Sequence, residues 1–266
     1  MAGVLCLRVW RGDVAAGEFV EYTVPVEQGE VVLDTVLRVQ ATQAGDLAVR
    51  WNCKAGKCGS CSAEINGRPK LMCMTRLTTL PAGPVTVTPL RTFQVIRDLV
   101  TDVSENYRRG RQIPAFSPPA ELRLAEYRMA QADVQRSQEF RKCIECWLCQ
   151  DVCYVIRDHE ENKAAYSGPR FFIRHAELDM HPLDTLDRRE LIRGQGGLGM
   201  CNVTRCCTEV CPAYMKIIDN AIIPMKERVI DQRYDPLRAL MPRWRRRPGR
   251  DRDDPADGGQ PIPGRQ

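Results

Sequence analysis

Two features are absent from this chain of 266 residues, and one residue type is scarce. No stretch approaches the roughly 18–20 consecutive apolar residues that a membrane-spanning helix needs. The first ten residues lack the basic and then apolar layout of a secretory signal peptide. Histidine occurs only at positions 159, 175 and 181, and the C-x-H pairs of a Rieske centre do not occur. We therefore expect a chain that is made and kept in the cytoplasm.

Positive charge is in excess only in the last segment of the chain, and the rest has little net charge. The formal net charge is +5, and the stretch from Pro242 to Gln266 contains seven Arg and four Asp, which leaves the rest close to neutral. A neutral folded part lacks the basic footprint of a nucleic-acid-binding surface, so we expect no nucleic-acid partner. Residues 242–266 have almost no apolar side chains and are predicted to be a disordered basic tail. Such a tail could contact anionic lipid headgroups or extend into solvent.

Cysteine, by contrast, is abundant, and 12 of the 13 cysteines fall into three sets. An odd number in a cytoplasmic chain argues against a disulfide framework. The first set has the spacing C-x4-C-x2-C-x11-C, the plant-type pattern for the ligands of a [2Fe–2S] centre. Its members are Cys53, Cys58, Cys61 and Cys73. Gly56 and Gly59 would let the backbone approach the cluster sulfides and donate N–H bonds to them.

The second and third sets resemble those of a bacterial two-cluster ferredoxin, in which the last cysteine of each run binds the other cluster. The second set is Cys143, Cys146, Cys149 and Cys153, and the third is Cys201, Cys206, Cys207 and Cys211, followed by Pro212. By that logic, Cys143, Cys146 and Cys149 bind one [4Fe–4S] cluster together with Cys211. Cys153 crosses over and joins Cys201 and Cys207 at the other cluster.

The nuclearity of this other cluster depends on its fourth ligand. A regular run that starts at Cys201 would place that ligand at position 204, which is Thr204. Three thiolates hold a [3Fe–4S] cluster, and Cys206 is then a thiol packed beside it. If Cys206 is instead an extra ligand, the cluster is a second [4Fe–4S]. Zinc is a rival metal because C-x2-C pairs also build zinc ribbons, but the four closely spaced cysteines at 143–153 do not fit a paired ribbon.

Residue patterns in the first third of the chain predict a mixed domain. Strands are predicted over residues 3–10, 19–27 and 84–90. A helix over 31–40 would place Val32, Val36 and Val39 on one apolar face. With the first cysteine set between this helix and the last strand, the order of elements favours a β-grasp [2Fe–2S] ferredoxin domain in residues 1–100.

The apolar period becomes helical near residue 91. Helices are predicted over residues 91–111, 120–140, 170–195 and 213–232. Loops between helices would carry the second and third cysteine sets. We therefore predict an α-helical ferredoxin domain with [4Fe–4S] and [3Fe–4S] clusters in residues 101–241, followed by the disordered tail. The fold class is α+β.

Taken together, these motifs resemble the iron–sulfur subunit of succinate dehydrogenase and fumarate reductase. Beyond the cysteines, the resemblance is carried by VIRDLV at 95–100, EFRKCIEC at 139–146, GPRFF at 168–172 and CTEVCP at 207–212. It covers roughly residues 3–235. It implies an electron-transfer chain that contains no catalytic residue and no substrate site of its own.

The resemblance also implies partners and a path for the electrons. A flavoprotein subunit with FAD oxidises succinate to fumarate in the tricarboxylic acid cycle, and its electrons pass through the [2Fe–2S], [4Fe–4S] and [3Fe–4S] clusters in that order. They leave to a quinone of the respiratory chain, held near a membrane-anchor subunit. Such a complex would place this chain peripherally on the cytoplasmic face of the inner (plasma) membrane.

The chain departs from this resemblance at the quinone end. Better-known members of the family have Pro directly after the cross-over cysteine and Trp a few residues later, whereas Cys153 is followed here by Tyr154 and Val155. Many members have His after the first cysteine of the third set, where this chain has Asn202. The usual quinone contacts are therefore not carried over to this chain.

Three other functions are compatible with the sequence. The first is the same subunit in a fumarate reductase, which runs the reaction in the reverse direction. The second is an iron–sulfur subunit of another flavin dehydrogenase, although the plant-type set ahead of the paired runs counts against it. The third is a zinc-binding module with a nucleic-acid-binding tail, which would be colourless.

Overall fold

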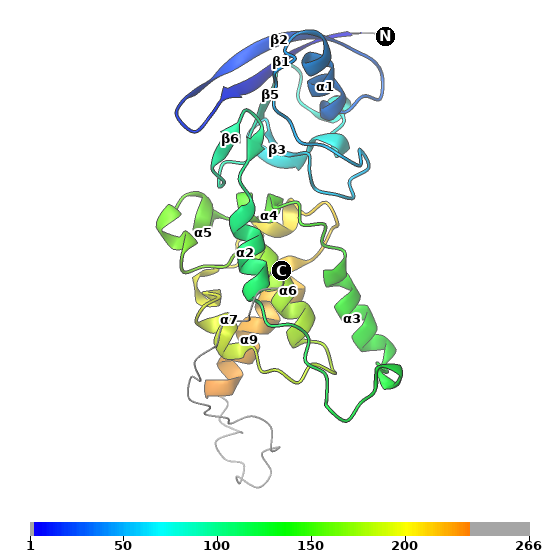
Figure 1. Ribbon diagram of the computed structural model, residues 1–266, viewed down its shortest axis with the longest axis vertical. Helices are drawn as coiled ribbons and strands as arrows, with labels where there is room; N and C mark the ends of the chain where they lie inside the picture. Colours follow the sequence, from blue (N-terminus) through cyan, green and yellow to red (C-terminus); the bar gives the residue numbers. More distant parts are fainter. Residues whose placement is uncertain (1–2, 235–266) are drawn as a thin grey trace, which may run out of the picture.

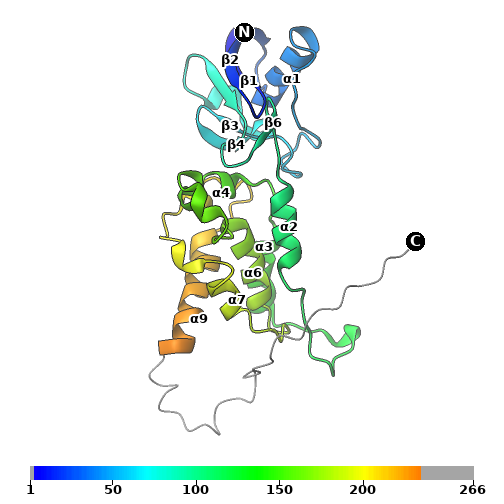
Figure 2. The same cartoon turned by 60° about the vertical axis from the view of Figure 1, so that its left-hand side comes forward.

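The computed structural model describes residues 3–234, and the predicted tail at 242–266 lies outside them. Figure 1 shows two lobes stacked along the long axis, one with the sheet and one with most of the helices. The lobes keep this order when the molecule is turned, as Figure 2 shows. The chain passes from the sheet lobe to the helical lobe at α2 (Ser104–Gln112).

The first lobe contains a five-stranded sheet in the order β2-β1-β5-β3-β4. Its strands are β1 (Gly3–Gly12), β2 (Gly17–Val26), β3 (Ser62–Ile65), β4 (Arg68–Leu71) and β5 (Val85–Thr88). β1 pairs antiparallel with β2 over ten residues and parallel with β5. A parallel pair needs a crossover connection, and α1 (Val32–Thr42) lies within it. The sheet and the helix confirm the predicted β-grasp ferredoxin fold.

The predicted apolar face of α1 lies in the core of this lobe. Val32, Val36 and Val39 are fully buried and belong to one apolar cluster with Leu7 and Val87 of the central strands. Burying a side chain of this size contributes about 1.5–3 kcal/mol. The helix therefore packs against the sheet, and the loop that contains the first cysteine set follows this helix in the chain.

The helix predicted over 91–111 is wrong in its first half. Two short antiparallel strands, β6 (Val95–Arg97) and β7 (Val100–Thr101), precede α2. The turn between them is fixed by Asp98, which is buried and accepts hydrogen bonds from the backbone N–H groups of Gly12 and Ala48. Both partners are distant in the sequence, and such tertiary contacts override a local apolar period.

The second lobe is built from short helices. They are α3 (Gln131–Arg141), α4 (Leu148–Asp151), α5 (Tyr154–Arg157), α6 (Pro169–Asp179), α7 (Arg189–Arg193), α8 (Cys206–Glu209) and α9 (Ile223–Tyr234), with a π-helical turn at Ile217–Ile222. Short 3₁₀ turns lie at Met72–Met74, Leu77–Thr79, Leu124–Glu126, Glu160–Lys163 and Leu198–Met200. Within residues 3–234, no helix has the length and apolar character needed to cross a membrane.

Two of the predicted helices are shorter than expected. The helix predicted over 120–140 begins only at residue 131. The one predicted over 170–195 is divided into α6 and α7, because Pro182 cannot continue a helix that reaches it. The long connections that result are tied down by polar contacts.

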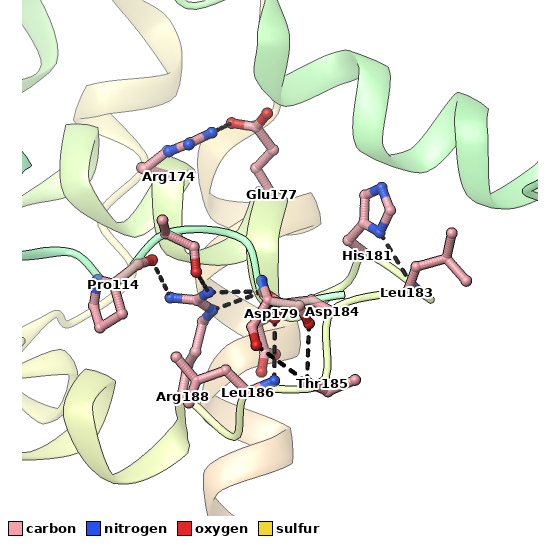
Figure 3. A network of polar contacts seen from close by, with 12 residues as sticks. Pro114, Arg174, Glu177, Asp179, His181, Leu183, Asp184, Thr185, Leu186 and Arg188 are labelled. Carbon is pink, nitrogen blue, oxygen red and sulfur yellow. Dashed lines mark hydrogen bonds and ion pairs between the residues drawn. The ribbon is translucent and has the colours of Figure 1, made fainter. Parts of the chain in front are cut away.

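A buried ion pair holds the connection after α2 against the helical lobe (Figure 3). The side chains of Arg188 and Asp184 are 0% and 1% exposed and lie 2.8 Å apart. The guanidinium of Arg188 also donates to the carbonyl oxygens of Pro114 and Ala115, at 2.6 and 2.8 Å. A charge buried this deeply requires such partners.

Replacing Arg188 by methionine is expected to lower the free energy of unfolding by about 3 kcal/mol, since breaking a buried ion pair typically costs about 3–5 kcal/mol. Asp184 would be left buried without its counter-charge. Urea unfolding of the full chain measures the loss. Arg193→Met is the control, because Arg193 and Glu190 form an ion pair with side chains 47% and 68% exposed. Equal unfolding midpoints for the two variants would contradict this role of Arg188.

Candidate metal centres

The first cysteine set lies on the loop between α1 and β3, and Cys73 closes it from the turn after β4. The sulfur of Cys53 accepts hydrogen bonds from the N–H groups of Ala55 and Lys57, at 3.4 and 3.3 Å. The N–H group of Cys73 donates to the sulfur of Cys61 at 3.5 Å. Backbone N–H groups directed at sulfur are what cluster ligands need, because they stabilise the negative thiolate.

The four thiols of this set differ in burial. Cys61 and Cys73 are buried, whereas Cys53 and Cys58 are half-buried. Burial raises the pKa of Cys61 to about 12. Partial burial acts in the same direction at Cys58, but hydrogen bonds from Ser60 and Cys53 outweigh it and hold the pKa of Cys58 at about 6. The site therefore has one side in the core and one side near the surface.

Three cysteines of the second set and the last cysteine of the third set come together at one cavity. Its lining includes Cys143, Cys146, Cys149 and Cys211. Glu145 and Trp147 have left-handed backbone conformations, which let the segment from Cys143 to Cys149 turn around the cavity. Trp147 is buried in the cavity wall, as expected of a side chain that shields a cluster from water.

The chemistry of these four residues fits a [4Fe–4S] cluster, which takes four thiolates. Burial raises the pKa of Cys146 to about 12 and that of Cys149 well above its usual value. Thiols of this kind lose their protons when a metal binds. Within residues 3–234, no three His, Cys, Asp or Glu side chains are close enough together to hold a single metal ion.

The third set lies in the apolar core of the helical lobe. Cys153, Cys201 and Cys207 are buried there, and burial raises the pKa of Cys153 to about 11. Cys206 is half-buried, and its sulfur lies 3.3 Å from Oγ1 of Thr204. A hydrogen bond with Cys207 lowers the pKa of Cys206 to about 6. The structure thus brings Cys206 into contact with the set, with Thr204 beside it.

A buried tyrosine touches two thiols of the third set. Tyr166 is 1% exposed, and its hydroxyl lies 3.7 Å from the sulfur of Cys153 and also contacts Cys201. A bound thiolate has no proton, so in a loaded site the phenol is the donor. The ring packs edge-on against Phe172 with centroids 5.5 Å apart, which fixes the direction of the hydroxyl. Burial raises the pKa of Tyr166, which keeps the hydroxyl protonated.

We expect Tyr166→Phe to lower the reduction potential of a cluster bound by the third set, because it removes a hydrogen bond to thiolate sulfur. A hydrogen bond to a charged group is worth about 1.5 kcal/mol, which corresponds to roughly 60 mV for one electron. Potentiometric EPR of the purified complex measures the shift. Tyr22→Phe is the control, since Tyr22 is buried in the sheet lobe and accepts from Arg11. An unchanged potential in Tyr166→Phe would mean that the hydroxyl does not donate to the ligands.

The first and second sets meet at a close backbone contact. A Cβ atom on Gly59 would lie 2.7 Å from Cα of Cys146, so a larger residue does not fit there. Beside it, Oγ of Ser62 is 2.8 Å from the carbonyl oxygen of Cys146 and donates to it. The sequence suggested that Gly59 lets the backbone approach the cluster sulfides. The structure adds a second role, because the absence of a side chain at Gly59 also lets the two cysteine loops approach each other.

Buried charges tie the lobes together near this contact. Arg157 of α5 pairs with Glu64 of β3 at 2.5 Å and with Asp151 of α4 at 3.3 Å. Oδ1 of Asp151 accepts hydrogen bonds from the N–H and hydroxyl groups of Thr92, at 3.0 and 3.1 Å. Burial raises the pKa of Asp151 to about 7. One guanidinium thus joins a strand of the first lobe to a helix of the second.

The sequence indicated the twelve clustered thiols but not the residues that position them. Ser62 and Asp151 could have been noticed by adjacency, because each lies next to or between cysteines of a set. Tyr166 lies 13 residues after Cys153 and belongs to no cysteine motif, so no sequence pattern points to it.

Two family models match the chain. One describes a 2Fe-2S iron-sulfur cluster binding domain and matches residues 6–108. The other describes a 4Fe-4S dicluster domain and matches residues 139–215. The first range contains the first cysteine set, and the second range contains the other two.

Several known proteins are similar to this chain. The fumarate reductase iron-sulfur subunit of Mycobacterium tuberculosis is 34% identical over 206 residues, which are 74% of this chain and 81% of that one. The succinate dehydrogenase iron-sulfur subunit of Bacillus subtilis is 29% identical over 172 residues, 62% of this chain and 66% of that one. A chain of the Mycobacterium smegmatis Sdh1 complex in the apo form matches at 68% identity with a TM-score of 0.87, over 89% of this chain and 100% of that one.

Proposed function

Because this chain belongs to the family of iron–sulfur subunits of succinate dehydrogenase and fumarate reductase, we propose that it passes electrons from the FAD of a flavoprotein subunit to a membrane quinone. The chain is the electron carrier of this oxidoreductase. When bound, its iron–sulfur clusters accept and release single electrons. The part of the protein is to hold the clusters, space them and tune their potentials.

We assign the cluster ligands from the places where the thiols gather. The [2Fe–2S] ligands are Cys53, Cys58, Cys61 and Cys73, the [4Fe–4S] ligands are Cys143, Cys146, Cys149 and Cys211, and the [3Fe–4S] ligands are Cys153, Cys201 and Cys207. The observation that carries this assignment is the shared cavity, since Cys211 lines it together with three cysteines more than sixty positions earlier. Residues 1–100 would hold the first cluster, and residues 101–241 the other two.

The proposed order of electron flow is supported by contacts between the sites. The first site adjoins the second through Gly59 and Cys146, whose backbones leave no room for a side chain between them. Two thiols of the second site, Cys149 and Cys211, belong to the same buried cluster as the thiols of the third site. These contacts support a second site between the other two.

Succinate oxidation is the direction we favour. The 68% identity to a chain of the Sdh1 complex over the whole of that chain supports it. The 34% identity to a fumarate reductase subunit favours the reverse direction as the second candidate. Both directions use the same clusters in opposite order, so the residues of this chain would have the same roles.

We further propose that the third site is the end that faces the membrane-anchor subunit and its quinone, with the chain peripheral on the cytoplasmic face. Tyr154 and Asn202 stand where better-known members of the resembled family have Pro and His, so the quinone contacts of this chain would differ from theirs. The N–H group of Tyr154 hydrogen-bonds to Cys206, which places this tyrosine beside the third site.

Affinity purification of the chain from cells that contain its natural partners tests this function. We expect a flavoprotein with FAD to copurify, and we expect succinate to reduce the cluster signals of the isolated complex. Fumarate plus a reduced quinone analogue measures the reverse rate and identifies the faster direction. Purification of a colourless chain that contains zinc would contradict the proposal.

A further inference from the structure

Arg170 is a cation in the wall of the second site. It lies in the first turn of α6, and it lines the cavity together with the four cysteines of that site. Only 13% of its side chain is exposed. A guanidinium buried to this extent is stable only when its N–H groups find acceptors or counter-charges.

The described part of the chain provides a partner for the outer end of this side chain but none for its Nε–H group. Nη2 of Arg170 pairs with Glu145, whose side chain is 45% exposed. Nε of Arg170 is buried and has no hydrogen-bond partner among the residues that the structure describes. Arginine does not lose its proton in proteins, so this N–H group remains a donor at all relevant pH values.

The cavity beside Arg170 is where an acceptor for this N–H group could bind. Arg170 lines the same cavity as Cys143 and Cys149. The guanidinium is therefore close to the ligands of the second site, while Glu145 holds its other end near solvent. Sulfur atoms of a bound cluster are negatively charged acceptors whose hydrogen bonds influence its potential.

We propose that Arg170 tunes the second centre, with its Nε–H donating to a sulfur atom of the [4Fe–4S] cluster and its positive charge favouring the reduced cluster. The inference rests on the proposed function, because it needs that cluster in the cavity. Glu145 is the opposing charge. It lies on the solvent side of the guanidinium, so it offsets the effect of Arg170 only in part.

Potentiometric EPR on the purified complex tests this role. In R170Q, the ratio of reduced to oxidised [4Fe–4S] at a fixed potential should fall about tenfold, which corresponds to a midpoint about 59 mV lower. R170K keeps the charge but loses Nε, so its midpoint should fall by less. E145Q removes the opposing charge and should raise the midpoint. The first and third centres should keep their midpoints in all three variants.

The matched control is R174Q. Arg174 lies one turn further along α6, pairs with Glu177 and has a side chain 40% exposed. Two results would overturn the inference. One is a midpoint of the second centre that equals wild type in both R170Q and E145Q, and the other is a shift of the same size in all three centres. If R170Q fails to assemble, the midpoints of the second centre in R170K and E145Q test the inference by the same criteria. Absence of a [4Fe–4S] signal in the wild-type complex would instead refute the ligand assignment itself.

Discussion

Cys211→Ser is expected to remove the [4Fe–4S] centre and to leave the [2Fe–2S] and third centres in place. Cys211 lines the same cavity as the first three cysteines of the second set, although it follows Cys207 closely in the sequence. Serine does not supply the soft thiolate that iron–sulfur clusters select. Succinate:quinone activity should fall by at least about 100-fold, because even outer-shell partners of a metal site contribute about 10–100-fold.

Cys153→Ser is the matched variant, and its effect should be the opposite. It removes a buried thiol that belongs to the same buried cluster as Cys201 and Cys207, so the third centre should disappear and the second should remain. EPR spectra of the reduced and oxidised complexes distinguish these centres. If Cys211→Ser removed the third centre and spared the second, the cross-over assignment would be wrong.

Gly59→Ala is expected to separate the two lobes at the point where the first and second sites meet. The added methyl group would lie 2.7 Å from Cα and 3.0 Å from the nitrogen of Cys146, and backbone atoms cannot move aside cheaply. Electron transfer becomes slower as the gap between two centres widens. We therefore expect succinate to reduce the first centre normally and the later centres more slowly, which rapid-freeze EPR measures.

Gly67→Ala separates backbone strain from this steric effect. Gly59 and Gly67 have φ of +70° and +73°, so an alanine in either place has similar strain of about 1–3 kcal/mol. No atom lies within 4 Å of a Cβ on Gly67, which is in the turn between β3 and β4. Equal slowing in both variants would mean that strain and not the contact with Cys146 is responsible.

The cysteine spacings were sufficient to predict the fold class, because each set needs a particular type of scaffold. The apolar face of α1 was equally predictable, since its period involves only neighbouring residues. The strands at 95–101 were not predictable, because Asp98 is held there by N–H groups from β1 and from the segment after α1. A window of neighbouring residues contains neither partner.

The surroundings of the centres were less predictable than the thiols. Tyr166 and Arg170 reach two different sites although they are separated by only three residues, since α6 begins between them and redirects the chain. Arg157 and Glu64 come from different lobes, so only the folded chain brings them together. Cysteine ligands follow a regular spacing that can be seen in the sequence. The residues that tune a centre follow no such spacing, because only the fold brings them close to it.

The most direct test of the account is a redox titration of the anaerobically purified complex, followed by EPR. Three centres with separate midpoints are expected, among them a [3Fe–4S] signal in the oxidised sample that succinate removes. A fully oxidised sample without that signal, together with two interacting [4Fe–4S] signals on reduction, would make Cys206 a ligand and contradict the assignment of the third centre. A sample without any iron–sulfur signal would contradict the account as a whole.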